Sequence, residues 1–280
     1  GTGGVRIANC SYWKFEGLYI RHGIGATSCV IPFVAAQSSN ITVRRLLIFE
    51  ASKADIPACQ ADNLRGANSL WFDNSVGGLI EENEFISAYV NVVMISGSDN
   101  VIRRNYVNPR AWVGFGDQYP SLISIYPGSR NIVENNIVEN GAIGLQISSI
   151  GDSLDNKFLG NLVLGHWVSG VALHCYVFGD PNNNTINTIV QNTVIIPIAT
   201  QFTYRSVWLS NADNTTVSNL SIFGVSSAEG GFTVWGNAYH VGCPVPATSF
   251  SLKNSMVTGY TDASAFGVQV RSDQGSLGSW

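Results

Sequence analysis

Short apolar runs, separated by asparagine, glycine and serine, recur along almost the whole chain. The stretch 129–140 reads Ser-Arg-Asn-Ile-Val-Glu-Asn-Asn-Ile-Val-Glu-Asn, so an asparagine, an apolar run, a second asparagine and another apolar run follow one another. The same order recurs at 100–107, 156–163, 187–194 and 214–221. Runs of this length, rich in β-branched residues and bounded by turn residues, predict short β-strands. No window shows helical periodicity over more than about two turns, so we expect an all-β protein.

The repeats align when Asn136 is taken as the reference position. The nine aligned residues are Gly17, Leu46, Asn83, Asn105, Asn136, Asn161, Asn192, Asn219 and Asn254. A second column, five residues earlier, contains Asn100, Asn131, Asn156, Asn187 and Asn214. A third column, two residues after the reference and predicted to face a core, contains Tyr19, Ile48, Phe85, Val107, Val138, Val163, Val194, Ser221 and Met256. Variable insertions between constant repeats are typical of a solenoid, in which each repeat forms one coil.

The asparagines have a physical explanation in such a solenoid. Equivalent residues of neighbouring coils stack about 4.8 Å apart, the spacing of paired strands. A side-chain amide carries both a donor and an acceptor, so stacked asparagines can bond one another along the axis. Asparagine also tolerates the left-handed backbone that a tight corner requires. The pattern therefore predicts asparagine ladders at the corners of the coils.

The repeats at 100–107, 131–138 and 156–163 resemble those of the right-handed parallel β-helix proteins of the pectate-lyase-like superfamily. The resemblance covers roughly residues 5–270 and implies a right-handed parallel β-helix of about nine to ten coils with asparagine ladders. Because no low-complexity linker interrupts the chain, we expect a single domain over 1–280. Proteins of this superfamily commonly bind polysaccharide on the long face of the solenoid.

The composition limits the classes of partner that the protein can have. Only 12% of residues are charged, against roughly 25% in ordinary soluble domains, and the net charge is −4. There is no basic stripe with interleaved aromatics, which argues against a nucleic-acid partner. No apolar run approaches the roughly 20 residues of a membrane-spanning helix. The opening Gly-Thr-Gly-Gly has neither the charged start nor the apolar core of a signal peptide, and suggests a processed chain or part of a longer one.

Five cysteines show no metal-binding spacing. Cys29 could pair with Cys59, and Cys175 with Cys243, while buried free thiols are the equal alternative. Low charge and these pairings favour an extracellular or cell-surface setting.

The first strand of each coil is predicted to present a binding face. A column eleven residues before the reference, inside these strands, contains Phe72, Met94, Ile125 and Trp208. Alternation along the strands predicts that one set of side chains points outward. The outward set is Trp71, Asp73, Val93, Ile95, Ser124, Tyr126, Gln146, Ser148, Ala172 and His174. Tyr126, Gln146 and His174 would then lie on successive coils.

These outward residues supply the candidate chemistry. His174, Tyr126 and Asp73 are the candidate acid–base residues, with Arg205 and Arg110 as further candidate bases. Trp71 would stack on a sugar ring, and Gln146 and Arg205 would contact the substrate. The segment 71–74, Trp-Phe-Asp-Asn, is similar to the Trp-Ile-Asp-His of pectate lyases, although Asn74 replaces the histidine.

Two functions stay open. A polysaccharide lyase needs a base and a cation, for which Ca2+ would be the cofactor, and a glycosidase needs two carboxylates roughly 5–10 Å apart. Asp73 is the one carboxylate expected on the face, and we predict no other metal or cofactor. The alternative is a non-catalytic structural or adhesive protein, which outward Val93, Ile95 and Val207 would favour. Neither end shows a helical cap, so self-association by end-to-end stacking, or flanking sequence, is expected.

Overall fold

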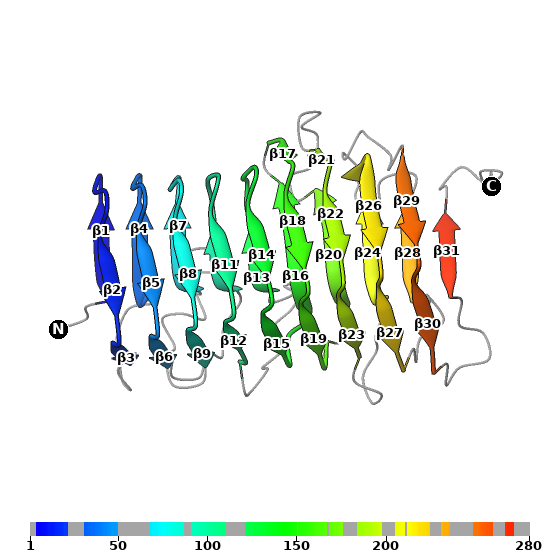
Figure 1. Cartoon of the computed structure of the whole chain (residues 1–280), viewed down its shortest axis with the longest axis horizontal. Coiled ribbons are helices and arrows are strands. Elements are labelled where there is room, and N and C mark those ends of the chain that lie inside the picture. The colour runs from blue at the N-terminus through cyan, green and yellow to red at the C-terminus, as the bar shows by residue number, and fades with distance from the viewer. Residues whose placement is uncertain are drawn as a thin grey trace, which may run out of the picture.

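The computed structural model describes residues 4–21, 31–49, 68–86, 91–109, 121–149, 151–166, 168–175, 184–197, 205–210, 212–224, 231–235, 249–259 and 267–271. Throughout these residues the only regular elements are short β-strands, stacked into a long solenoid (Figure 1). Three parallel sheets run along it, with ten, nine and nine strands, and a three-stranded sheet lies beside them. The predicted all-β parallel β-helix is confirmed.

The first sheet carries the predicted binding face. Its strands, in spatial order, are β1 (Val5–Ala8), β4 (Phe33–Ala36), β7 (Asn68–Asp73), β10 (Asn91–Ile95), β13 (Ser121–Ile125), β16 (Ile143–Ser149), β20 (Ser169–Cys175), β24 (Val207–Ser210), β28 (Phe232–Trp235) and β31 (Val268–Arg271).

The other sheets complete each coil. The second contains β2 (Lys14–Glu16), β5 (Thr42–Arg44), β8 (Leu79–Glu81), β11 (Val101–Arg103), β14 (Ile132–Glu134), β18 (Lys157–Leu159), β22 (Ile189–Gln191), β26 (Thr215–Ser218) and β29 (Phe250–Lys253). The third contains β3 (Tyr19–Arg21), β6 (Leu47–Phe49), β9 (Glu84–Ile86), β12 (Tyr106–Val107), β15 (Ile137–Glu139), β19 (Leu162–Leu164), β23 (Val194–Ile196), β27 (Ser221–Phe223) and β30 (Met256–Thr258). The short sheet contains β17 (Ser153–Leu154), β21 (Thr185–Ile186) and β25 (Ala212–Asp213).

Most strands of the second and third sheets have three residues, and the middle one points inward. In the second sheet, Val43, Ile80 and Ile102 follow one another in register and are fully buried. One continuous apolar core results, filled by the inward residues of all three sheets. The two outer residues of each strand point away from it, as the pleat requires.

The two predicted asparagine ladders exist in the central coils. Asn83, Asn105 and Asn136 each donate an amide hydrogen to the next asparagine of their ladder, the last to Asn161, at 2.9–3.1 Å. Each of the four amides also donates to a backbone carbonyl of the preceding coil. The second ladder joins Asn100, Asn131 and Asn156 in the same way. Buried amides with donors and acceptors both used stabilise the corner.

Some residues assigned to the first ladder lie one position before it. Asn192 is level with Gly160, because Leu159 pairs with Gln191, and Thr193 takes the ladder position. The displaced residues have φ angles of 47–67° and are Gly17, Asn192, Asn219 and Asn254. In the second column the displaced residues are Asn187 and Asn214. Asparagine suits both neighbouring corner positions, one for its amide and one for its left-handed backbone, so an alignment on asparagine alone mixes them.

This slip also corrects the predicted core column. Tyr19, Val194, Ser221 and Met256 point outward, and the two largest are 61% and 47% exposed. The inward residues are those that follow them: Ile20, Ile195, Ile222 and Val257. A shift of one residue exchanges the two faces of a strand.

The outward set on the first sheet needs a similar correction. Val93, Ile95 and Val207 are fully buried in the core, whereas Met94 and Trp208 point outward. Eight positions separate Phe72 from its second-sheet counterpart Ile80, but only seven separate Ile95 from Ile102. The turn after Ile95 is one residue shorter, so counting back from the ladder asparagine exchanges the inward and outward residues of β10. At Trp208 the same exchange arises because Asn219, taken as the reference, lies one position before the ladder.

Cys10 is a free thiol. Cys29, Cys59 and Cys243 lie outside the described residues, so the pairings stay predictions. End-to-end stacking also stays a prediction. No helix among the described residues is long and apolar enough to cross a membrane.

Candidate functional site

The outward face of the first sheet has two regions with different exposure. Four half-buried side chains, Trp71, Asp73, Met94 and Tyr126, form what we call the open patch. Four side chains further along, Gln146, His174, Arg205 and Trp208, are each at most 7% exposed and form what we call the closed cluster. Both regions belong to the same sheet, and strand register fixes their positions.

Two columns of the sheet carry most of these residues. In one column Trp71, Met94, Ser124, Gln146, Ala172 and Trp208 follow one another in register. In the other column Ser148 pairs with His174, and Tyr126 follows directly after β13. Tyr126, Gln146 and His174 therefore lie on successive coils, as predicted. Trp71 and Asp73 lie on β7, four coils and about 19 Å from the coil of His174.

The closed cluster is a chain of polar and aromatic contacts. Ser121 donates a hydrogen bond to Oε1 of Gln146. Nε2 of Gln146 lies 2.5 Å from Nε2 of His174. The His174 ring stacks on Trp208 with centroids 4.8 Å apart and planes 4° apart, and the Arg205 guanidinium carbon lies 4.4 Å from the centroid of that indole.

This arrangement constrains what His174 does. The Gln146 amide nitrogen can only donate, so Nε2 of His174 accepts, and the neutral ring carries its hydrogen on Nδ1. The donor at Nε2 occupies the ring lone pair that would accept a proton from a substrate. Burial further separates the ring from a polymer on the surface. The geometry favours a structural contact for His174 and for Arg205.

The open patch is held by a different set of bonds. The Trp71 indole N–H donates to Oγ of Ser96 at 3.3 Å, and that hydroxyl donates to the Tyr126 carbonyl at 2.6 Å. The Asn74 amide donates to Oδ1 of Asp73 at 3.2 Å. These bonds fix the indole across the coil boundary, while Asp73 and Tyr126 lie two coils, about 10 Å, apart in one column.

The six predicted site residues thus divide between the two regions. Trp71, Asp73 and Tyr126 belong to the open patch; Gln146, His174 and Arg205 belong to the closed cluster. Trp208 was not predicted to point outward, because the one-residue displacement of Asn219 from the ladder assigned it to the core. Arg110 lies outside the described residues.

The predicted Ca2+ would need several oxygen ligands close together. No group of three or more His, Cys, Asp or Glu residues there could hold a metal ion. Asp73 is one carboxylate, whereas a Ca2+ site takes six to eight oxygen ligands. The predicted Ca2+ stays untested.

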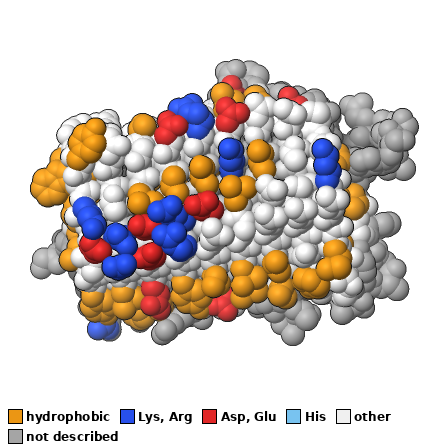
Figure 2. Space-filling model, viewed as in Figure 1, with side chains coloured by type: hydrophobic (Ala, Val, Ile, Leu, Met, Phe, Trp, Pro, Cys, Tyr) orange, Lys and Arg blue, Asp and Glu red, His pale blue; other side chains and the backbone are white. Residues whose placement is uncertain are grey.

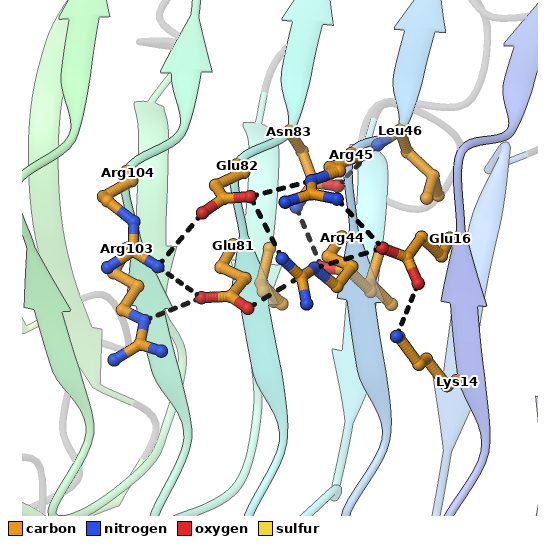
Figure 3. A network of polar contacts seen from close by, with 12 residues as sticks. Lys14, Glu16, Arg44, Arg45, Leu46, Glu81, Glu82, Asn83, Arg103 and Arg104 are labelled. Atoms are coloured by element: carbon orange, nitrogen blue, oxygen red, sulfur yellow. Dashed lines mark hydrogen bonds and ion pairs between the residues drawn. The ribbon is translucent and has the colours of Figure 1, made fainter.

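A second polar surface occupies the outer face of the second sheet near the N-terminus (Figure 2). Five residues in register alternate in charge: Glu16, Arg44, Glu81, Arg103 and Glu134. We call this row the charge ladder. Figure 3 shows that the ion pairs run across the coils, with Glu81 accepting from Arg103 at 2.9 Å.

A parallel row reinforces the charge ladder. Arg45, Glu82 and Arg104 occupy left-handed corner positions with φ of 53–56°. Hydrogen bonds from Arg45 and Arg44 lower the pKa of Glu82 below its usual value. Because these charges pair with one another across the coils, the surface is a network that links neighbouring strands of the second sheet. The charges look dispersed in the sequence, yet all five stand at one aligned position, two residues before the ladder position of their coil.

No protein-family model and no curated protein sequence matches the chain. Among solved structures, the chain is similar to the Dettilon tailspike protein, with 10% identity, 94% of this chain and 61% of that chain covered, and a TM-score of 0.54. It is also similar to a double mutant of a periplasmic alginate epimerase, with 14% identity over 82% of this chain and 47% of that one, at a TM-score of 0.47. A Streptococcus pneumoniae surface protein and adhesin matches at 11% identity, 85% and 68% coverage, and a TM-score of 0.33. The chain thus spans about half of the epimerase and three-fifths of the tailspike. The likeness to the tailspike shows the fold, a right-handed parallel β-helix.

Proposed function

We propose that this protein binds polysaccharide at the open patch, outside the cell or at its surface. The observation that carries the proposal is the fixed, half-buried Trp71, with Asp73 on the same strand and Tyr126 two coils away. An indole presents a flat apolar face to the C–H groups of a sugar ring. A carboxylate and a phenol supply hydrogen-bond partners for sugar hydroxyls.

The solenoid suits a polymeric ligand. Its coils repeat about every 4.8 Å, a step comparable to the length of one sugar unit. A polysaccharide that runs along the axis therefore meets side chains at regular intervals. Because Ser96 already holds the indole, little side-chain freedom is lost on binding.

Among the described residues of the open patch, cleavage would use Asp73 and Tyr126, the predicted acid–base residues. A glycosidase needs a second carboxylate, and none of the other outward residues that the structure describes on the first sheet carries one. This favours binding without cleavage.

Affinity electrophoresis in gels containing soluble polysaccharides tests the proposal. At least one polymer should retard the protein, and Trp71→Ala should abolish the retardation. Tyr19→Ala is the matched control, because it removes an exposed aromatic ring from the third sheet. Equal retardation of both variants would exclude the open patch as the binding site.

The structural or adhesive alternative retains one supporting observation. The apolar stripe predicted on the first sheet no longer supports it, because Val93, Ile95 and Val207 are core residues. Instead, partly exposed apolar side chains line the third sheet, visible along the lower edge of Figure 2. They include Ile137, Ile196, Phe223 and Met256. If this row joins two copies, sedimentation should show a concentration-dependent dimer that Ile196→Lys abolishes.

A further inference from the structure

We infer that the open patch selects uncharged polysaccharides and discriminates against polyuronates and other polyanions. The inference rests on the proposed function and names its class of substrate. It follows from the charges on the face, which can be traced coil by coil.

Asp73 is the one charged side chain at the patch among the described residues. Its register neighbour on β4 is Ala36, and the neighbour of Trp71 there is Val34. The outward residues of the next three coils are likewise neutral: Met94, Ser96, Ser124, Tyr126, Gln146 and Ser148. No cation in the described part of the chain lies within ion-pair distance of Asp73. Among the described residues, therefore, no neighbouring cation balances the negative charge that a ligand would meet on this patch.

The outward cations of the first sheet lie further away. Arg205 is five coils from Asp73, 3% exposed, and stacked over Trp208. Arg6 is exposed but lies two coils before Trp71, about 10 Å away. That separation is roughly one Debye length at physiological ionic strength, so its attraction for a charge at the patch is largely screened.

A uronate at the patch would place its carboxylate beside that of Asp73. Like charges at contact distance repel, more strongly where a ligand displaces water. A neutral sugar instead donates its hydroxyls to Asp73, and a charged acceptor makes the stronger kind of hydrogen bond. One carboxylate thus favours neutral chains and disfavours acidic ones.

Matched polymers test this directly. A soluble glucan, mannan and galactan are each compared with the same polymer oxidised at C6 to the uronate, by isothermal titration calorimetry. At physiological ionic strength the oxidised form should bind at least about tenfold more weakly, about 1.4 kcal/mol. The difference should shrink at about 0.5 M salt, because salt screens the repulsion.

Single substitutions test whether the Asp73 carboxylate causes the preference for neutral polymers. Asp73→Asn should narrow the gap between the paired polymers by strengthening the oxidised form. Glu134→Gln makes the same change in net charge on the second sheet and should leave the gap unchanged. Arg6→Gln should also leave the preference unchanged.

The outcomes separate the two proposals. Equal or tighter binding of an oxidised polymer would overturn the inference and leave polysaccharide binding intact. Loss of the preference in Glu134→Gln would overturn it as well, because the selectivity would then reflect net charge. If no member of any pair binds, the proposed function itself fails.

Discussion

The open patch and the closed cluster occupy one face of one sheet, yet they use their aromatic residues differently. Trp71 is half-buried and held by a serine hydroxyl, whereas Trp208 is 5% exposed and lies against both His174 and Arg205. An outward position in a β-helix strand therefore does not make a residue available to a ligand. Under the proposed function, the closed cluster stabilises the fold and the open patch binds the ligand, and four experiments test that division.

Trp208→Ala should have the largest effect. Removing a buried indole leaves a cavity and deprives two neighbours of their ring contacts, so the free energy of unfolding should fall by about 3 kcal/mol. Urea titration followed by circular dichroism measures it. Polysaccharide affinity of the folded variant should stay within about twofold of the parent, below the tenfold that corresponds to 1.4 kcal/mol. A large loss of affinity with unchanged stability would reverse the roles of the two regions.

Acid should have the next largest effect on stability, through a buried histidine outside both regions. His166 precedes β20, is fully buried and has both ring nitrogens without a hydrogen-bond partner. Burial lowers the pKa of His166 from 6.5 to about 3. The unfolded chain takes up the proton below pH 6.5 and the folded chain does not, so stability is present above pH 6.5 and is lost as pH falls towards 3.

The loss should reach about 2 kcal/mol at pH 5. Urea midpoints at pH 7 and pH 5 measure it, and His166→Leu should remove this part of the pH dependence. An unchanged pH dependence in that variant would show that other groups cause it.

Trp71→Ala should reduce polysaccharide affinity more than stability, the reverse of Trp208→Ala. The affinity for a bound polysaccharide should fall at least about tenfold, or 1.4 kcal/mol. Stability should fall by less than in Trp208→Ala, because the indole is only partly buried. Titration calorimetry and urea unfolding on the same preparation give both quantities. Undiminished affinity would remove Trp71 from the site.

Ser96→Ala should have the smallest effect. It frees the Trp71 indole and leaves the ring in place, so affinity should fall about threefold through lost preorganisation. Ser148→Ala, on the same face but outside the open patch, is the control and should leave affinity unchanged. A loss as large as that of Trp71→Ala would indicate that Ser96 itself contacts the sugar.

The fold was predictable because the asparagine ladder is a local, repeated signal. Asn136 bonds to a stacked asparagine on each side, so asparagine recurs at the equivalent position of neighbouring repeats. The register was less predictable, because Asn135 and Asn136 stand side by side and serve different needs. Asn135 takes the left-handed backbone, with φ of 54°, and Asn136 takes the ladder.

Of the candidate site, the sequence predicted only that its residues lie on the outward face of the first sheet. Alternation within a strand correctly placed Trp71, Tyr126 and His174 on the outside, because it depends on two-residue periodicity alone. Burial depends on contacts between distant parts of the chain, which no strand pattern contains. The separation of His174 from Asp73 and the stacking on Trp208 therefore needed the structure.

The charge ladder has a consequence for assembly of the coils. Neighbouring coils of a repetitive chain resemble one another, so a strand can pair with the wrong partner while folding. If β5 skipped β8 and paired with β11, Arg44 would lie against Arg103; if β2 skipped β5, Glu16 would lie against Glu81. Like charges directly opposite one another disfavour such pairs. Among these five coils, the alternation therefore disfavours any pairing that skips a single coil.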